Sequence, residues 1–216
     1  MNPALTINNL SVEAQDTLLL DIFSLNIPSG EKVTIAGQSG SGKSTLLRCI
    51  MGFMLPSSGT IEIFGERLDA DTVWRLRGKM AYVAQEPELG EGIVRDALQH
   101  PFTYKINRGT AYSESKAVEL FERFQLNASF LEKDICSLSG GEKQRIALVI
   151  ALSLERPLLL LDEAASALDS TSKKAVREYL CQCDALTILS VSHDIRDFSL
   201  SESIVTLPSA GKGVVT

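Results

Sequence analysis

Short apolar runs alternate with helical patterns along much of the chain. Five of these runs are short and aliphatic enough to predict strands, with the middle ones fully buried: Val33–Ala36, Met80–Ala84, Leu158–Leu161, Leu186–Val191 and Ile204–Leu207. Because such alternation favours strands that pair in parallel around a buried sheet, the pattern predicts an α/β fold with a mostly parallel sheet.

The first 30 residues carry a different pattern. Three apolar segments separated by polar turns predict short antiparallel strands, namely Leu5–Ile7, Leu18–Leu20 and Phe23–Ile27. A turn at Pro28–Gly30 then leads into the first core strand. We therefore expect an N-terminal antiparallel β subdomain.

Between about residues 88 and 157 the apolar spacing is helical. Ser113 can cap a helix whose buried face comprises Ala117, Leu120, Phe121 and Phe124. Since no linker rich in Pro, Gly or Ser divides the sequence, we expect one domain over residues 1–216. In this interpretation residues 1–87 and 158–216 form the β subdomain and the catalytic core, and residues 88–157 form an inserted α-helical subdomain.

A glycine-rich segment joins the first core strand to a helical run. It comprises Gly37, Gln38, Ser39, Gly40, Ser41, Gly42, Lys43, Ser44 and Thr45. A strand before it and a helix after it favour a phosphate-binding P-loop over a simple glycine-rich turn. Its backbone N–H groups and the helix dipole would bind phosphate oxygens, Lys43 would reach the outer phosphates, and Ser44 would offer a hydroxyl to Mg²⁺. We expect a P-loop NTPase (RecA-like) core.

The strand Leu158–Leu161 ends in two carboxylates, Asp162 and Glu163. A charge at the end of a buried strand is costly without a partner, and Mg²⁺ is a suitable one. We assign Asp162 to the metal shell and Glu163 to polarising the attacking water, since phosphoryl transfer depends on positioning and electrostatics. Without the P-loop upstream, the same residues would be equally consistent with an ordinary strand followed by a solvated turn.

The segment Leu138–Arg145 narrows the class of nucleotide enzyme. Ser139 and Glu142 have the spacing of a capping box, which could mark the start of any helix. The glycines between them, Gly140 and Gly141, would leave that helix N-terminus open to a phosphate. Leu-Ser-Gly-Gly-Glu resembles the signature motif of ATP-binding-cassette (ABC) ATPases, and the chain resembles that family over essentially its whole length.

Further positions match this family in the family's order. The resemblance implies that Gln85 touches Mg²⁺ or the lytic water, that Asp169 lies in a loop crossing between two subunits, and that His193 contacts the γ-phosphate. The catalytic residues would then be Glu163, His193 and Gln85, and the metal ligands would be Ser44, Gln85 and Asp162. Several of these positions follow the carboxyl ends of buried strands, where ligands bind in open α/β sheets.

The resemblance also implies an assembly. Two copies would pair head to tail so that the P-loop of one and Ser139–Gly141 of the other enclose one ATP, and hydrolysis would need this homodimer. The dimer would drive a separate multi-span permease, docked on residues from about Glu86 to Tyr104. The implied function is that of the ATP-hydrolysing subunit of an ABC transporter, with ATP and Mg²⁺ as cofactors.

Composition excludes several other partners and compartments. The net charge of -6 disfavours binding to nucleic acid, which requires a basic face. The longest apolar run, Ile146–Leu154, is too short to span a membrane, and the N-terminus lacks the pattern of a signal peptide. We expect a cytoplasmic protein bound peripherally to the cytoplasmic face of the cell membrane.

Two alternative functions account for fewer features. A non-transport ABC ATPase of DNA repair or chromosome structure would carry coiled-coil or zinc insertions or two fused cassettes, which this sequence lacks. A small-molecule P-loop kinase would need an acceptor-binding lid and would have no use for Leu138–Glu142.

Two finer expectations concern the cargo and the base. Phe121–Phe124, Leu138–Arg145, Leu158–Asp169 and the short C-terminus after Ile204–Leu207 resemble the ATPase subunit of the FetAB-type iron exporters of bacteria, which implies a metal cargo such as iron. Residues 1–22 contain no Phe, Tyr, Trp or His on which adenine could stack, as it does in many ABC ATPases. We therefore predict low base selectivity, with comparable kcat/KM for ATP and GTP.

Overall fold

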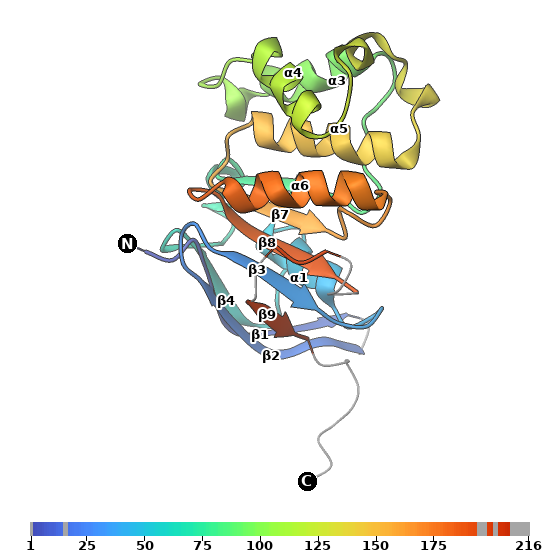
Figure 1. Cartoon of the computed structure of the whole chain (residues 1–216). Helices are drawn as coiled ribbons and strands as arrows, with labels where there is room; N and C mark the ends of the chain where they lie inside the picture. The colour runs from blue at the N-terminus through green and yellow to red at the C-terminus, as the bar shows by residue number, and fades with distance from the viewer. Residues whose placement is uncertain (1, 15–16, 194–197, 201–202, 208–216) are drawn as a thin grey trace.

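A computed structural model describes residues 2–14, 17–193, 198–200 and 203–207. Figure 1 shows these residues arranged in layers. Helices α5 (Gly140–Ser153) and α6 (Ser170–Gln182) lie over one face of a parallel sheet, and α3 (Val94–Gln99) and α4 (Glu114–Arg123) pack on α5 beyond it. Helix α1 (Lys43–Ile50) lies on the other face of this sheet, next to an antiparallel sheet. The predicted fold class is confirmed.

The parallel sheet has the strand order β6-β7-β8-β3-β9. Its strands are β3 (Lys32–Ala36), β6 (Met80–Val83), β7 (Leu158–Asp162), β8 (Thr187–Ser192) and β9 (Ile204–Thr206). All five predicted core strands are present, and β7 is buried along its whole length. Parallel pairing brings the carboxyl ends of β6, β7, β8 and β3 to one edge of the sheet.

The antiparallel sheet has the order β2-β1-β4-β5. Its strands are β1 (Leu5–Ala14), β2 (Thr17–Ile27), β4 (Ser58–Ile63) and β5 (Glu66–Arg67). The prediction of short N-terminal strands was wrong in length, because β1 and β2 each continue through their polar residues. Asn9 and Ile22 have positive φ angles of 46° and 43°, and the β1–β2 register shifts between Ile7 and Val12. Bulges of this kind let a long strand bend without ending.

The helices account for most of the remaining chain. They are α1 (Lys43–Ile50), α2 (Val73–Arg77), α3 (Val94–Gln99), α4 (Glu114–Arg123), α5 (Gly140–Ser153) and α6 (Ser170–Gln182). Short 3-10 helices, which the sequence pattern did not predict, fill much of the segment between residues 88 and 157: His100–Thr103, Lys105–Asn107, Ala128–Glu132 and Ile135–Ser137. Ser113 caps α4 as predicted, because its side chain accepts from the Lys116 N–H.

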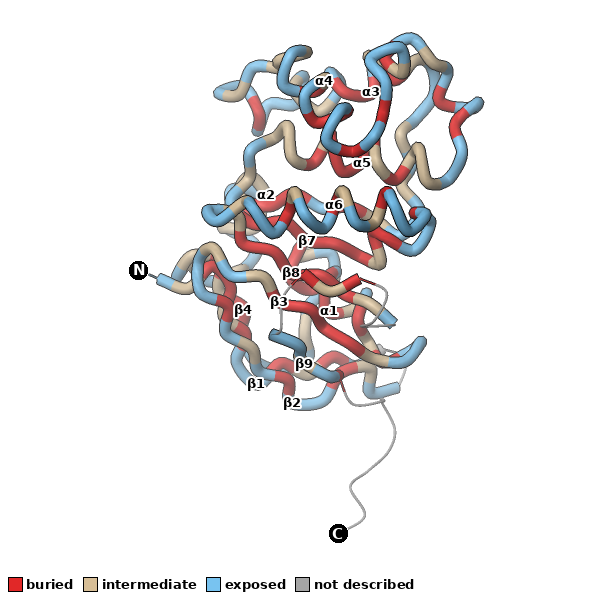
Figure 2. Tube along the Cα trace, in the orientation of Figure 1, coloured by how far each residue is buried: buried red, intermediate tan, exposed pale blue. Residues whose placement is uncertain are grey.

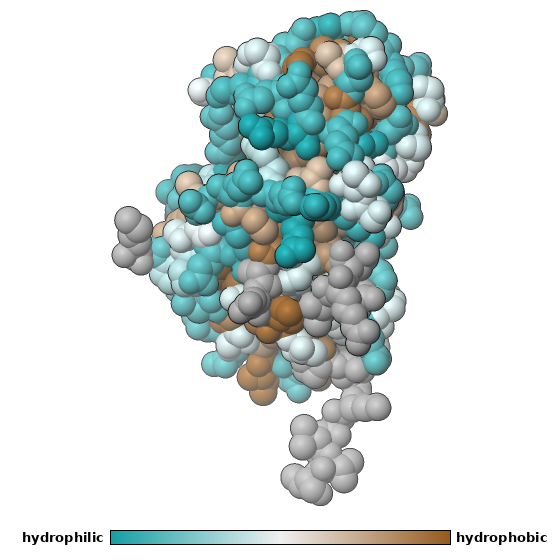
Figure 3. Space-filling view, in the orientation of Figure 1, coloured by the Kyte–Doolittle hydropathy of each residue, from teal (hydrophilic) through white to brown (hydrophobic). Residues whose placement is uncertain are grey.

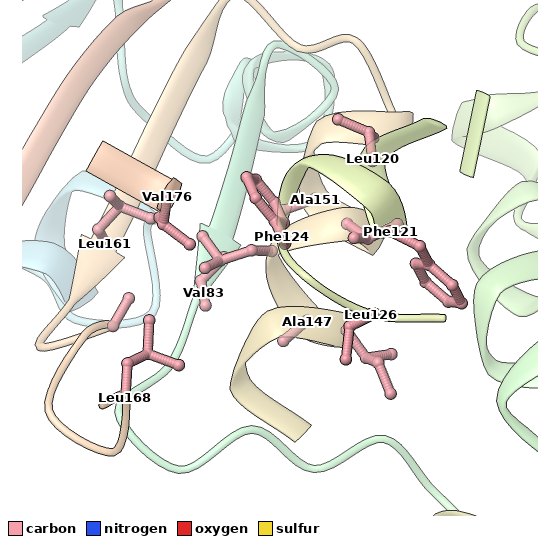
Figure 4. Packing of buried hydrophobic residues seen from close by; sticks show 14 of the residues in the cluster. Val83, Leu120, Phe121, Phe124, Leu126, Ala147, Ala151, Leu161, Leu168 and Val176 are labelled. Atoms are coloured by element: carbon pink, nitrogen blue, oxygen red, sulfur yellow. The ribbon is translucent and has the colours of Figure 1, made fainter. Parts of the chain in front are cut away.

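Two clusters of buried apolar side chains hold the layers together. In Figure 4, Phe124 from the helical segment lies against Val83 of β6, and Leu161 of β7 lies near Val176 of α6; all four belong to one cluster. The second cluster surrounds α1 between the two sheets. Figure 2 shows the central strands β7 and β8 as buried and the outer turns of the helices as exposed. The parallel sheet is therefore covered on both faces, which explains its continuous apolar runs.

Hydrophilic side chains cover much of the face of α6 that Figure 3 presents. Among the helices that the structure describes, none combines the length and the hydropathy needed to span a membrane. The predicted domain limits extend to residue 216, which lies outside the described residues, and the subdomain limits at 87/88 and 157/158 remain predictions.

Candidate active site

A cleft of about 610 Å³ opens at the carboxyl edge of the parallel sheet. Its lining residues come from the loop after β3, from the ends of β6, β7 and β8, and from β2: Leu19, Gln38, Ser39, Gly40, Gly42, Lys43, Ser44, Thr45, Gln85, Glu163 and His193. Most of the residues predicted to bind nucleotide therefore lie around one opening, as expected for an open α/β sheet.

The glycine-rich loop depends on its glycines for its shape. Gly40 and Gly42 have φ angles of 81° and 91°, in the left-handed region that other residues rarely adopt. A Cβ on Gly42 would lie 2.5 Å from the carbonyl oxygen of Leu19, and a Cβ on Gly37 would lie 2.4 Å from Ser41 Oγ. Ser41 is buried, and Gly37 does not line the cleft. These two predicted loop residues would therefore act through their backbone.

Helix α1 begins directly at Lys43 and presents its N-terminus to the cleft. No side chain caps its first turn and no acidic residue lies there, so the free N–H groups and the positive end of the helix dipole suit an anion. Lys43 is buried, and its Nζ donates to the carbonyl oxygens of Gly37 at 2.7 Å and Gln38 at 3.0 Å.

Asp162 is the last residue of β7 and is 7% exposed; it lies next to the lining residue Glu163 but does not itself line the cleft. Its Oδ1 lies 3.4 Å from Ser44 Oγ, and its Oδ2 lies 3.1 Å from Tyr82 Oη. Burial raises the pKa of the Asp162 carboxyl, and the hydrogen bonds from Tyr82 and Ser44 partly offset this effect. The oxygen donors of Ser44 and Asp162 are adjacent, and Mg²⁺ is bound by oxygen ligands, so the residues present fit a Mg²⁺ site.

Side chains from three separate parts of the chain point toward the Glu163 carboxylate. Its Oε2 lies 3.1 Å from Gln85 Nε2 and 3.2 Å from His193 Nδ1, and its Oε1 lies 3.9 Å from Lys43 Nζ. The backbone of Glu163 has a φ of 47°, an unusual conformation for a residue with a side chain. Strained residues of this kind cluster at functional sites, and this one turns its carboxylate toward the cleft.

The predicted capping box is present at the start of α5. Ser139 Oγ accepts from the Glu142 N–H at 3.3 Å, and Glu142 Oε2 accepts from the Ser139 N–H at 2.7 Å. The hydrogen bond from the Ser139 backbone lowers the pKa of Glu142. The helix begins at Gly140, directly after its cap Ser139. Ser139, Gly140 and Gly141 do not line the cleft of their own chain.

Asp169 has a local role that its family resemblance did not indicate. It caps α6, accepting from the N–H groups of Thr171 and Ser172 and from Ser172 Oγ at 2.7 Å. The hydrogen bond from the Ser172 side chain contributes most to lowering the pKa of Asp169 to about 2. The Asp169 side chain does not line the cleft of its own chain.

Three further residues of the site were not predicted from the sequence. Tyr82 contacts Asp162, and its pKa is raised to about 12, first by burial and then by the charge of Asp162. Gln144 is buried in α5 and donates to the Ala84 carbonyl at 3.1 Å, which links α5 to the residue before Gln85. Leu19 lines the cleft next to Gly42. In the sequence, Gln144 could have been identified only as a polar side chain on an otherwise apolar, buried helix face.

Comparisons with known proteins identify the family. Residues 20–166 match the family described as ABC transporter. The chain is 35% identical to the probable iron export ATP-binding protein FetA of Escherichia coli (strain K12), over 98% of this chain and 94% of FetA. It is 32% identical to the energy-coupling factor transporter ATP-binding protein EcfA1 of Bacillus subtilis (strain 168), over 89% of this chain and 70% of EcfA1.

A solved structure agrees with these relatives. The ATP-binding cassette MJ0796, solved as a dimer in a post-hydrolysis state with ADP and phosphate, aligns with a TM-score of 0.83 and 29% identity over 95% of each chain. The chain therefore belongs to the ABC transporter family and is an ATP-binding, ATP-hydrolysing subunit of that family.

Proposed function

We propose that Glu163 is the base that activates water for ATP hydrolysis, in a site completed by a second copy of the chain. The observation that carries the proposal is the convergence of Gln85, His193 and Lys43 on the Glu163 carboxylate, at 3.1 to 3.9 Å. A carboxylate oriented by several donors beside a P-loop has the position that phosphoryl transfer requires of a water-positioning group.

The other residues of the cleft would divide the remaining work. Lys43 and the first turn of α1 would hold the outer phosphates and neutralise their charge. Ser44, Asp162 and Gln85 would hold Mg²⁺, which would supply positive charge against the β- and γ-phosphates. Gln85 and His193 would keep Glu163 aimed at the water, and Glu163 would take its proton.

The position of Ser139–Gly141 supports a homodimer. This segment exposes the N-terminus of α5 but lies apart from the cleft of its own chain, so it would serve the nucleotide of a partner. A head-to-tail pair with two-fold symmetry would place both copies of the segment against both nucleotides. The dimeric state of the cassette MJ0796 supports this arrangement.

Mixing two inactive variants tests the shared site. Lys43→Met removes the P-loop cation, and Gly140→Asp places a carboxylate at the start of α5. A Cβ at Gly140 would lie 3.9 Å from the Ala167 Cβ, an ordinary contact, and an acidic residue favours a helix N-terminus. Gly140→Asp should therefore fold normally while repelling phosphate.

In the mixture, each mixed pair would contain one intact site and one doubly damaged site. Random pairing would restore up to about a quarter of the wild-type sites, which phosphate release would detect above the background of either variant alone. If the mixture remains as inactive as its components, the shared-site proposal is wrong.

The partner of this dimer would be a separate multi-span permease. Phe53, Leu55 and Trp74 form an exposed apolar surface at the C-terminal end of α1 and on α2. The guanidinium of Arg77 lies 4.2 Å from the Phe53 ring centroid and 4.8 Å from that of Trp74, and its Nε donates to the Met51 carbonyl. Exposed apolar surfaces often mark protein interfaces.

The sequence also predicts a docking segment at Glu86–Tyr104. Charge reversal at Arg95 is a poor test of that segment, because Arg95 forms ion pairs with Glu114 and Glu132 within the helical layer. Asp96 is exposed and is the better site for a charge-reversal test.

Purification from solubilised membranes tests the transport assignment. The wild-type chain should recover a multi-span membrane protein that stimulates its ATPase activity, and Trp74→Ala should lose both recovery and stimulation. Recovery of DNA-processing factors in place of a membrane protein would contradict the proposal. The same experiment tests the proposed peripheral association with the membrane.

The names of two relatives bear on the cargo. FetA is named for iron export, whereas EcfA1 is named for an energy-coupling factor transporter and its name gives no cargo. Among the described residues, no group of three or more His, Cys, Asp or Glu side chains could hold a metal ion. Iron therefore stays a prediction from the resemblance to FetAB-type exporters, to be tested by transport with the recovered permease.

A further inference from the structure

Tyr82 and Asp162 share one face of the parallel sheet. In β6, Met80 packs into the cluster around α1, whereas Ala81 and Val83 pack into the cluster below the helices. In β7, Leu160 likewise packs toward α1 and Leu161 toward the helices. Because successive side chains alternate between faces, Tyr82 and Asp162 both project on the α1 side.

The strand register then brings the two side chains together. Tyr82 pairs with Leu160 in the parallel ladder, so Asp162 lies two residues farther along β7. Two residues of strand span about 7 Å, a distance that a phenol ring can bridge. The Tyr82 Oη accordingly lies 3.1 Å from Asp162 Oδ2.

The Asp162 carboxylate is held at both oxygens. An ionised carboxylate can only accept hydrogen bonds, so the hydroxyls of Ser44 and Tyr82 both donate to it. The Ser44 hydroxyl is itself a proposed metal ligand and would turn toward the cation. Tyr82 would then be the contact that still fixes the orientation of the carboxylate.

We propose that Tyr82 is a positioning residue for Asp162, holding Oδ2 so that Oδ1 faces the cation of the metal–ATP complex. This inference rests on the proposed metal role of Asp162. Mg²⁺ demands near-octahedral geometry, and groups that orient metal ligands typically affect metal affinity by about 10–100-fold. Tyr82 is 39% exposed and lies on an edge strand, so its hydroxyl is not needed to fill the core.

The test replaces Mg²⁺ by Mn²⁺, whose free concentration electron paramagnetic resonance reports directly. Tyr82→Phe removes the hydroxyl and keeps the ring. Tyr112→Phe is the matched control, because the Tyr112 hydroxyl is buried without a hydrogen-bond partner among the described residues. Asp162→Asn tests the metal role itself. The full chain with ATP is titrated with Mn²⁺, and ATP binding is also measured in EDTA.

We expect Tyr82→Phe to weaken Mn²⁺ binding about tenfold, Tyr112→Phe to match wild type, and metal-free ATP binding to be equal in all three proteins. A Mn²⁺ titration of Tyr82→Phe that overlays wild type, while Asp162→Asn loses affinity, would overturn the role of Tyr82 alone. If Asp162→Asn also overlays wild type, the proposed metal site fails and this inference fails with it. Loss of metal-free ATP binding in Tyr82→Phe would indicate a general structural role and would overturn the positioning role.

Discussion

Replacing Glu163 by glutamine separates the charge of this side chain from its shape. The amide oxygen can still accept the hydrogen bond that Gln85 Nε2 now donates at 3.1 Å. A neutral amide cannot take a proton from water, and it loses its attraction to Lys43. The substitution should therefore leave the architecture of the cleft intact while removing the proposed base.

The size of the effect follows from this role. A positioned general base contributes about 10²–10⁴ in rate, which corresponds to about 3–5 kcal/mol of activation free energy. Binding should change in the opposite direction. The Glu163 carboxylate is largely buried and lies 3.9 Å from Lys43 Nζ, so its removal lowers the repulsion that a phosphate would meet. ATP affinity should stay equal or increase.

Phosphate release, equilibrium nucleotide binding and gel filtration in ATP together test this expectation. Slow turnover with intact binding should trap a nucleotide-dependent dimer that wild type forms only transiently. Glu155→Gln is the control, because Glu155 is exposed and paired only with Lys116 among the described residues. Turnover of Glu163→Gln within tenfold of wild type, with no dimer, would refute the assignment of Glu163 as the base.

Three other variants test separate parts of the structure. Asp169→Ala should lower the free energy of unfolding in urea by about 0.5–2 kcal/mol, whereas Asp169→Asn, which keeps a capping oxygen, should not. Equal stability of wild type, Asp169→Ala and Asp169→Asn would contradict the capping role. Phe124→Ala, at a fully buried position, should lower the free energy of unfolding by about 3–5 kcal/mol and Tm by about 6–20 °C, whereas Leu55→Ala at the surface should lower neither. Equal shifts in Tm for the two variants would contradict the placement of Phe124 in the core. Leu19→Tyr should add an aromatic surface worth about 0.5–1.5 kcal/mol and lower the KM for both ATP and GTP by about 2–10-fold, because either base can stack on it. A strong ATP preference in wild type would contradict the low base selectivity predicted from the sequence.

The P-loop and the acidic pair could be predicted from the sequence because their chemistry is local. Lys43, Asp162 and His193 each follow a strand that its own apolar run identifies, and parallel strands end at a common edge. Tyr82 could not be predicted in this way. In sequence it is an ordinary strand residue, and its contact with Asp162 depends on the register between β6 and β7, which lie far apart in the chain.

The same limit explains the errors in the fold. Strand β1 passes through Asn8 and Asn9, and β2 passes through Asp21 and Ile22, where polar residues and positive φ angles interrupt the alternation that identifies a strand. Pairing with neighbouring strands keeps these segments extended. The contact of Gln144 with Ala84 spans 60 residues, so no local pattern could have indicated it.

The packing of Gly141 has a kinetic consequence. A Cβ on Gly141 would lie 2.9 Å from the carbonyl oxygen of Ala167, so the first turn of α5 rests directly on the backbone four residues after Glu163. In the proposed dimer, α5 faces the partner's nucleotide, while Glu163 faces the chain's own. When nucleotide fills the partner's site, a displacement of α5 would therefore be transmitted through this backbone contact to Glu163, the base of the other site. We expect the two sites to hydrolyse ATP cooperatively, so that the rate of hydrolysis rises more steeply than in proportion to the ATP concentration.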